Sequence, residues 1–222
     1  LNSNSNATTL SFNNAALASA SDSITINLEG VTDAAGADTG DITLARSSGA
    51  TNDLESVTLN SSVVANSIET LNVGGVDTAT LNVTGDQNLT ITDMLDTDIS
   101  TVNASSFTGV LNVKLSATST SLTGGSAADD VTRGSLLDNV NMGAGNDKIR
   151  TSDANLDKTS TIAGGDGTDT LIAVGDTTVI DTDFTLVSSV ETLTSVADDA
   201  LTVTLGAKAA AAGLATVTMA DT

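Results

Sequence analysis

Three observations predict an all-β chain that winds into a right-handed parallel β-helix, a form of β-solenoid. Short stretches in which aliphatic residues alternate with Thr, Asn or Ser recur along the chain, and this alternation is the period of a β-strand. Residues 124–172 hold four nonapeptides rich in Gly and Asp, a pattern typical of parallel β-helices that bind calcium in their turns. The chain has three Phe, no Trp and no Tyr, which suits a narrow interior filled by stacked aliphatic side chains.

The composition excludes several classes of function. The 222 residues include 28 acidic and 7 basic side chains, a formal charge of −21, which excludes a basic footprint for nucleic acid. Because Cys and His are absent, thiol nucleophiles, His-based triads and the usual Zn²⁺ sites are unavailable. Neither an HExxH motif nor a GxSxG motif occurs. We therefore expect a protein that is not an enzyme, and its many carboxylates suit work with a divalent cation.

The chain divides into three expected segments. A Thr/Asn-rich β-solenoid covers 1–115, a calcium-binding β-roll covers 116–175, and a further stretch of solenoid with a short helical cap or linker covers 176–222. Thr and Val favour strands, whereas Gly, Asp, Asn and Ser favour the turns between them. In the first segment the expected strands cover residues 23–28, 41–44, 56–59, 70–73, 80–83, 89–92 and 110–113. Short helices are expected at two Ala-rich stretches, 14–20 and 206–214.

Each of the four nonapeptides has Asp at its sixth place and an aliphatic residue at its eighth. Three are consecutive, and the fourth follows after thirteen residues; they begin at Gly124, Arg133, Met142 and Gly164. The Asp residues are Asp129, Asp138, Asp147 and Asp169. The aliphatic residues, expected to face inward from very short strands, are Val131, Val140, Ile149 and Leu171. Glycine supplies the positive φ that tight turns between such strands need.

Two nonapeptides make one coil in this interpretation, so Asp129 and Asp147, eighteen residues apart, stack on one side. Their carboxylates and several turn carbonyls would face a gap between coils, and hard oxygen ligands of this kind suit Ca²⁺. Without an ion the stacked carboxylates repel each other, so calcium binding and coil formation are expected to be coupled. The alternative is a set of acidic, glycine-rich loops that bind no ion.

Several positions depart from this regular pattern, and the residues that stand where it has glycine are Ala127, Arg133, Leu136 and Met142. Arg133 takes the place of the first glycine in its nonapeptide, so we expect the weakest metal site there, at Asp138. Residues 151–163 are one nonapeptide with a four-residue insertion, in which Asp153 or Asp157 is a candidate to stand opposite Asp138.

The sequence flanking the calcium segment is expected to continue the solenoid. Residues 115–123 have Thr120 at the place of the Asp, which predicts a metal-free coil. Alternation returns at residues 178–180, 184–187 and 189–193. Glu69 and Glu191 occupy similar places in two of these short units. They could form a catalytic carboxylate pair, but two turn-edge residues of a repeated unit are the better interpretation.

The nonapeptides resemble the RTX repeats of proteins exported by type I secretion. Residues 80–92 (TLNVTGDQNLTIT) precede the units GGSAADDV, MGAGNDKI and GGDGTDTLI, and VETL at 190–193 follows them. This order is similar to that of the RTX-containing surface-layer proteins of Gram-negative bacteria. The resemblance implies a Ca²⁺-dependent β-solenoid that assembles with copies of itself into a lattice outside the cell.

The resemblance also implies which residues hold the ions. In RTX proteins one turn contributes the carbonyls of its second and fourth places and its Asp, and the next turn on that side contributes the carbonyls of its first and third places and its Asp. Carried over, one site would comprise Gly125, Ala127, Asp129, Met142, Ala144 and Asp147. A second site would comprise Gly143, Gly145, Asp147, Gly164, Asp166 and Asp169.

We therefore expect a structural, calcium-stiffened segment of a secreted surface-layer protein that forms a lattice or filament, with a cell-surface polysaccharide as a candidate anchor. An adhesin or matrix module is the first alternative, and the calcium-binding tail of a secreted hydrolase is the second. Residues 1–11 lack the features of a secretory signal, and no apolar run reaches membrane-spanning length. Export by type I secretion, with no membrane insertion, is the expectation.

Overall fold

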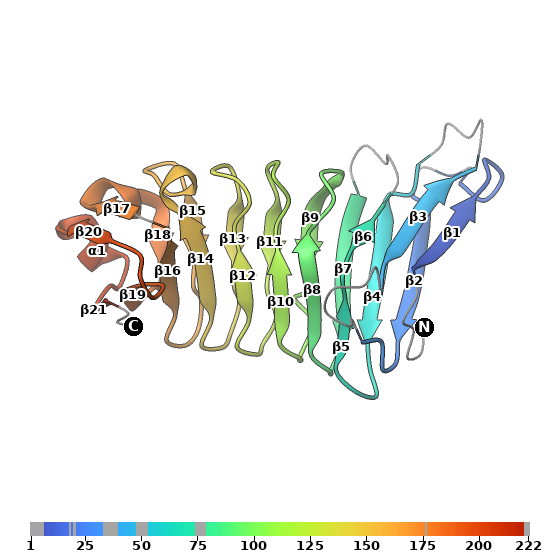
Figure 1. Cartoon of the computed structure of the whole chain (residues 1–222), viewed down its shortest axis with the longest axis horizontal. Helices are drawn as coiled ribbons and strands as arrows, with labels where there is room; N and C mark the ends of the chain where they lie inside the picture. The colour runs from blue at the N-terminus through green and yellow to red at the C-terminus, as the bar shows by residue number, and fades with distance from the viewer. Residues whose placement is uncertain are drawn as a thin grey trace.

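The computed structural model describes residues 7–17, 19, 21–32, 40–47, 53–73, 79–175 and 177–219. These residues are mostly in β-strands, and the strands pair in parallel. Two eight-stranded sheets run along the molecule (Figure 1). From β7 to β16 consecutive strands fall alternately in the two sheets. The chain thus has the all-β, solenoid-like course that the alternating sequence predicts.

Strands from the whole described chain contribute to these sheets. The first long sheet contains, in order, β2 (Ser23–Leu28), β4 (Ser56–Ser61), β7 (Ala79–Gly85), β9 (Ile99–Asn103), β11 (Ser121–Thr123), β13 (Asn139–Asn141), β15 (Thr161–Ala163) and β18 (Val187–Ser188). The second long sheet contains β5 (Asn66–Ile68), β8 (Leu89–Met94), β10 (Leu111–Lys114), β12 (Asp130–Thr132), β14 (Lys148–Ser152), β16 (Thr170–Val174), β19 (Thr192–Ser195) and β21 (Thr216–Thr218). Two smaller parallel sheets contain β1 (Thr8–Phe12), β3 (Ile42–Arg46) and β6 (Leu71–Asn72), and β17 (Thr177–Ile180) with β20 (Leu201–Thr204).

The strand register gives the length of each circuit of the chain. Asn112 of β10 pairs with Asp130 of β12, and Asp130 pairs with Lys148 of β14, so a circuit takes eighteen residues here. Lys148 pairs with Thr170 of β16, twenty-two residues further on. The additional residues lie between β14 and β15, where Asp153–Asn155 form a 3₁₀ helix, η1. The four-residue insertion expected within 151–163 is thereby confirmed.

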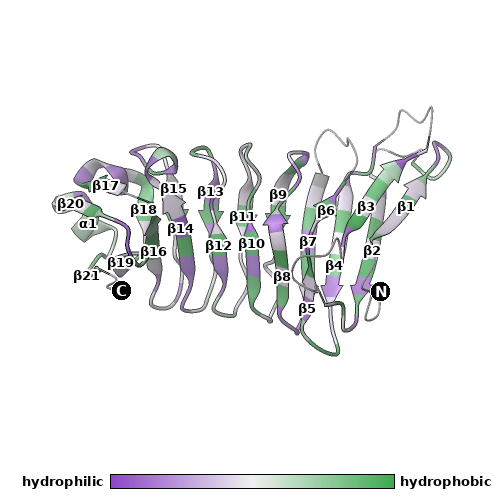
Figure 2. Ribbon diagram, viewed as in Figure 1, coloured by the Kyte–Doolittle hydropathy of each residue, from purple (hydrophilic) through white to green (hydrophobic). Residues whose placement is uncertain are grey.

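Aliphatic residues at every second strand position fill the interior. The eighth-place residues of all four nonapeptides have 0% exposed surface: Val131, Val140, Ile149 and Leu171. Figure 2 shows apolar and polar residues alternating along the strands. Burial of one such side chain stabilises the fold by about 1.5–3 kcal/mol. The aliphatic residues whose alternation predicts the strands therefore also stabilise the stack through their burial.

One expected strand is largely a helix. Of residues 184–187, the first three belong to a 3₁₀ helix, η2 (Asp181–Leu186), and β18 begins at Val187. The carboxylate of Asp183 accepts the backbone N–H of Ile180 at 2.9 Å, and Phe184 is buried. A side chain bonded to the backbone three residues back closes a helical turn, and alternating apolar residues do not reveal this.

The two expected helices have different outcomes. The second forms as α1 (Ala207–Ala211). In the first stretch residues 14–17 form a turn, and residues 18 and 20 lie outside the described residues. The side chain of Asn13 accepts the N–H groups of Ala15 (3.0 Å) and Ala16 (3.1 Å), and Asn bonded in this way favours a turn over a helix.

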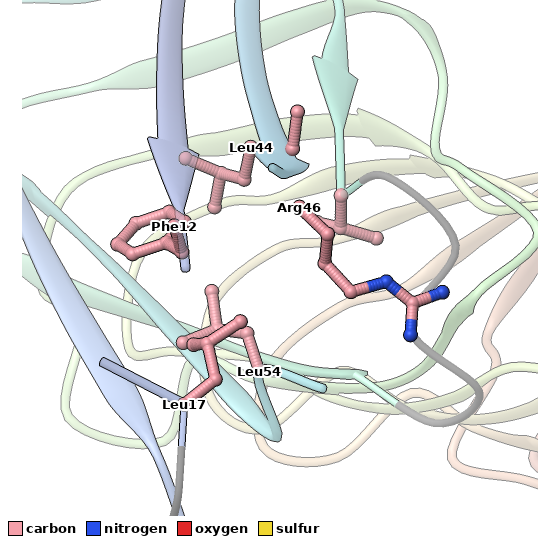
Figure 3. A pocket seen from close by; sticks show the side chains of 7 residues that line it. Phe12, Leu17, Leu44, Arg46 and Leu54 are labelled. Atoms are coloured by element: carbon pink, nitrogen blue, oxygen red, sulfur yellow. The ribbon is translucent and has the colours of Figure 1, made fainter. Parts of the chain in front are cut away.

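A small apolar pocket lies near the N-terminal end of the stack (Figure 3). Its lining residues are Phe12, Leu17, Leu44, Ala45, Arg46, Leu54 and Val73. The guanidinium of Arg46 points away from the labelled apolar side chains and pairs with Asp53, so we assign the pocket to packing at the end of the stack. In the part of the chain that the structure describes, no helix has the length and apolar character needed to cross a membrane.

Candidate metal centre

Three stacked turns carry the predicted metal ligands. They lead from the first long sheet into the second and comprise residues 124–129, 142–147 and 164–169. Ala144 and Asp166 form a parallel bridge between two of these turns. The N–H of Ala144 donates to the carbonyl of Gly125 (3.0 Å), and the N–H of Asp166 donates to the carbonyl of Gly143 (2.9 Å). The structure therefore brings the predicted ligands of all three turns into one column.

Glycine is required where carbonyl oxygens approach the next turn. Gly145 and Gly167 occupy equivalent places and have φ of +141° and +142°, a region that other residues rarely adopt. A Cβ on Gly145 would lie 2.3 Å from the carbonyl oxygen of Ala127, and a Cβ on Gly167 would lie 1.7 Å from that of Gly145. The gap between turns is thus lined by main-chain oxygen atoms.

Four acidic side chains form a carboxylate ladder beside these turns. Each accepts the backbone N–H of the equivalent residue one circuit earlier: Leu111 donates to Asp129 (2.8 Å), Asp129 to Asp147 (2.7 Å), Asp147 to Asp169 (2.8 Å) and Asp169 to Glu191 (2.7 Å). The three Asp residues are at most 1% exposed. Hydrogen bonds of this kind hold each carboxylate against the neighbouring coil.

The second carboxylate oxygen distinguishes the rungs of this ladder. Oδ2 of Asp129 accepts the N–H of Gly125 at 3.1 Å. Oδ2 of Asp147 and Oδ2 of Asp169 are buried and have no hydrogen-bond partner. A buried carboxylate oxygen without a donor is costly unless a proton or a cation compensates it.

The pKa values of these carboxyl groups also indicate that a proton or a cation is favoured beside them. Burial raises the pKa of Asp147 to about 7, aided by the neighbouring charges of Asp129 and Asp169 and opposed by the hydrogen bond from the Asp129 N–H. Burial also raises the pKa of Asp169, with a further contribution from Glu191, and it raises the pKa of Asp129. A divalent cation would remove this penalty by favouring the ionised carboxylates.

The residues fit Ca²⁺ better than a transition metal. Among the described residues no three acidic, His or Cys side chains converge on one point, so main-chain carbonyls would have to supply most ligands beside the carboxylates. Such an oxygen-rich set is typical of Ca²⁺. The site with Asp147 and Asp169 has two carboxylate oxygens without a hydrogen-bond partner, whereas the site with Asp129 and Asp147 has one. The second implied site therefore fits an ion best.

Asp138 lies apart from the other predicted ligands, because its turn joins the second long sheet to the first at the opposite edge. Both of its oxygens are occupied by backbone N–H groups, from Thr120 (2.9 Å), Gly134 (3.0 Å) and Ser135 (2.9 Å). Residue 160 stands opposite it, since Asn139 pairs with Thr161. Neither Asp153 nor Asp157 takes that place, so this expectation is wrong.

Glu191 is a member of the ladder that the nonapeptide pattern misses. Its repeat lacks the glycines of the nonapeptide. An acidic residue followed by Thr and Leu nevertheless occurs both at 169–171 and at 191–193, and this shared order could have identified Glu191 from the sequence. Glu69 lies between β5 and β6, whereas Glu191 lies before β19 near the other end of the stack (Figure 1). The two glutamates do not form a pair.

No family model matches the chain, and no curated protein or solved structure matches it.

Proposed function

We propose that the chain is a calcium-stiffened structural segment of a secreted bacterial surface-layer protein, folded as a right-handed parallel β-helix. The observation that carries this proposal is the pair of buried, partnerless carboxylate oxygens on Asp147 and Asp169, in turns lined by main-chain carbonyls. Ca²⁺ would supply the positive charge that these oxygens lack.

The chain's own residues would hold the ion between two coils. The carboxylates of Asp147 and Asp169 are already fixed by backbone N–H donors. The carbonyls of Gly143, Gly145, Gly164 and Asp166 are the remaining candidate ligands. Asp129 and Asp147, with the carbonyls of Gly125, Ala127, Met142 and Ala144, would form the second, weaker site. Binding in either place would crosslink successive coils, so the folded state would be stabilised by mass action.

The proposed calcium sites favour an extracellular location. Calcium modules that work outside cells bind at about 10⁻⁴–10⁻³ M, and sites built largely from carbonyls on a chain of net charge −21 suit that range. Such a segment would be disordered or weakened where calcium is scarce and would become rigid after export.

The outer face of the first long sheet is a candidate contact surface between copies of the chain. Its described outward-facing residues carry no charge, and they are Ser23, Thr25, Asn27, Ser56, Thr58, Asn60, Thr80, Asn82, Thr84, Ser100, Thr101, Asn103, Ser121, Thr123, Asn139, Asn141, Thr161, Ala163 and Ser188. The second long sheet instead exposes charged residues such as Lys114, Asp130 and Arg150.

This uncharged face suits a second copy of the same chain. Hydroxyl and amide groups both donate and accept hydrogen bonds, so the face is complementary to itself. Two chains of charge −21 repel each other, and an uncharged face lets them meet without opposing carboxylates. An adhesin would instead remain monomeric and bind a sugar or a host protein, and a hydrolase tail would need a catalytic domain elsewhere.

The test is isothermal titration calorimetry with Ca²⁺, followed by electron microscopy of the purified chain with Ca²⁺ and with a chelator. We expect calcium binding with a rise in thermal midpoint, and ordered sheets or filaments that disperse on chelation. A chain with the same thermal midpoint in both conditions would refute the calcium part. Calcium binding by a chain that stays monomeric would favour the adhesin.

A further inference from the structure

The turn at 133–138 contains a buried cation supplied by the chain itself. Arg133 is only 3% exposed. Its guanidinium donates to three main-chain carbonyl oxygens, those of Leu136 (3.0 Å) and Asp138 (3.3 Å) in its own turn and that of Asn155 in the next circuit. A charged side chain is rarely buried to this extent, so its surroundings must replace water around the charge.

These surroundings have the composition of a calcium turn. They include carbonyls from two successive circuits and the carboxylate of Asp138 at the sixth place of the nonapeptide. Burial lowers the pKa of Arg133, while the charges of Asp138 and Asp157 raise it. The two carboxylates thus offset part of the loss of hydration, although burial remains the larger effect.

We propose that the guanidinium of Arg133 takes the place of a divalent cation in this turn, so that this edge of the stack is held together without metal. The inference rests on the proposed calcium function of the opposite edge, where Gly124, Met142 and Gly164 occupy the first place. Arginine suits the role because it carries a permanent charge and its two terminal nitrogens reach all three carbonyls, although its Nε is buried without a partner.

The four-residue insertion contributes one of the carbonyls that bind the guanidinium of Arg133. It forms η1, Asp153–Asn155, and the carbonyl of Asn155 accepts from the guanidinium. The hydroxyl of Thr151 donates to the same carbonyl at 3.1 Å. The irregular circuit therefore places an acceptor where the long arginine side chain reaches it.

Arg133→Gly restores the usual glycine and tests the proposal by gain of function. We expect this variant to bind one more Ca²⁺ per chain than the natural chain in calorimetry, and to lose the added ion when Asp138→Asn is combined with it. Its thermal midpoint should fall in chelator and recover in Ca²⁺. Arg133→Met is the matched control, because it removes the charge and keeps the bulk; its midpoint should lie below that of the natural chain in chelator and in Ca²⁺ alike.

The outcomes separate this inference from the proposed function. If the natural chain binds Ca²⁺ and Arg133→Gly binds no more, the inference is wrong and the calcium function stands. If the natural chain binds none and Arg133→Gly binds one ion, the calcium function is wrong and the inference is supported. An Arg133→Gly chain that fails to fold even with Ca²⁺ present also counts against the inference.

Discussion

Asp147 serves two neighbours at once. Its Oδ1 accepts the N–H of Asp129 and its own N–H donates to Asp169, while its Oδ2 has no partner. Asp138 has the same place in its nonapeptide, yet three backbone N–H groups already occupy both of its carboxylate oxygens, and, against the rise that burial causes, the charge of Arg133 lowers its pKa. The same residue at the same place of the repeat therefore differs in chemistry, because Gly134 and Ser135 donate to the second oxygen of Asp138 whereas that of Asp147 has no donor.

Asp147→Ala should weaken calcium binding at least tenfold, because it removes a carboxylate shared by both implied sites. Asp138→Ala should leave calcium binding nearly unchanged but lower the free energy of unfolding by about 1–3 kcal/mol, since it leaves the N–H groups of Thr120, Gly134 and Ser135 without an acceptor. Calorimetric titration and urea unfolding of both variants provide the check. Equal losses of calcium affinity would argue against the assignment.

The stability of the metal-free chain should depend on pH through Asp147. Its folded pKa of about 7 lies above the unfolded value near 3.8, so the folded state binds more protons between these limits. The stabilising contribution is complete below about pH 4 and is lost as pH rises through about 7. Urea midpoints measured in chelator should therefore fall from pH 5 to pH 8, and Asp147→Asn should flatten that fall. A rise over this range in the unmodified chain would contradict the ladder's electrostatics.

At the scale of single elements, the turns depend on backbone shape. Gly145 has φ +141°, and a Cβ there would meet the carbonyl of Ala127. Gly175 has φ +77°, with nothing within 4 Å of a Cβ. Both glycines have positive φ, but they differ in its value and in their surroundings.

Gly145→Ala should consequently cost more than Gly175→Ala. The second variant carries only the strain of positive φ, about 1–2 kcal/mol, while the first must also displace a main-chain oxygen. Thermal unfolding in Ca²⁺ and in chelator measures both. If the two variants lose the same stability, close contact between the turns is not what requires glycine at 145.

Much of each element could be predicted from the sequence, and the exceptions have physical causes. Alternation predicts the strands because inward aliphatic residues determine burial, and nonapeptide spacing predicts that Asp129 and Asp147 stack. The η2 turn depends on one side chain-to-backbone bond from Asp183. The burial of Arg133 depends on Asn155 in the next circuit, a contact that local pattern does not contain.

On the scale of the whole molecule, charge is distributed unevenly. The outer face of the first long sheet is uncharged in its described part, whereas acidic residues concentrate in turns and at the ends of strands. Files of equivalent residues cross this face, as in Thr58, Asn82, Asn103 and Thr123, which pair in register. Side-chain hydrogen bonds join neighbouring strands on this face: the amide of Asn103 donates to Asn82 at 3.5 Å, and that of Asn82 donates to Ser56 at 2.8 Å.

Thr123→Glu should impair calcium-dependent assembly, because it places a carboxylate in the middle of the proposed contact face. Asn112→Glu is the control, since it adds the same charge at an exposed position on the second long sheet. Light scattering and electron microscopy should show assembly reduced for the first and retained for the second. If both variants assemble like the natural chain, the contact lies elsewhere.

The carboxylate ladder also gives the column a direction. Each acidic side chain accepts a backbone N–H from the coil before it, so removing one carboxylate affects the coil on its N-terminal side. Loss of the Glu191 carboxylate would leave the N–H of Asp169 in the preceding coil without its acceptor, whereas loss of the Asp129 carboxylate would do the same to Leu111 at the opposite end of the ladder.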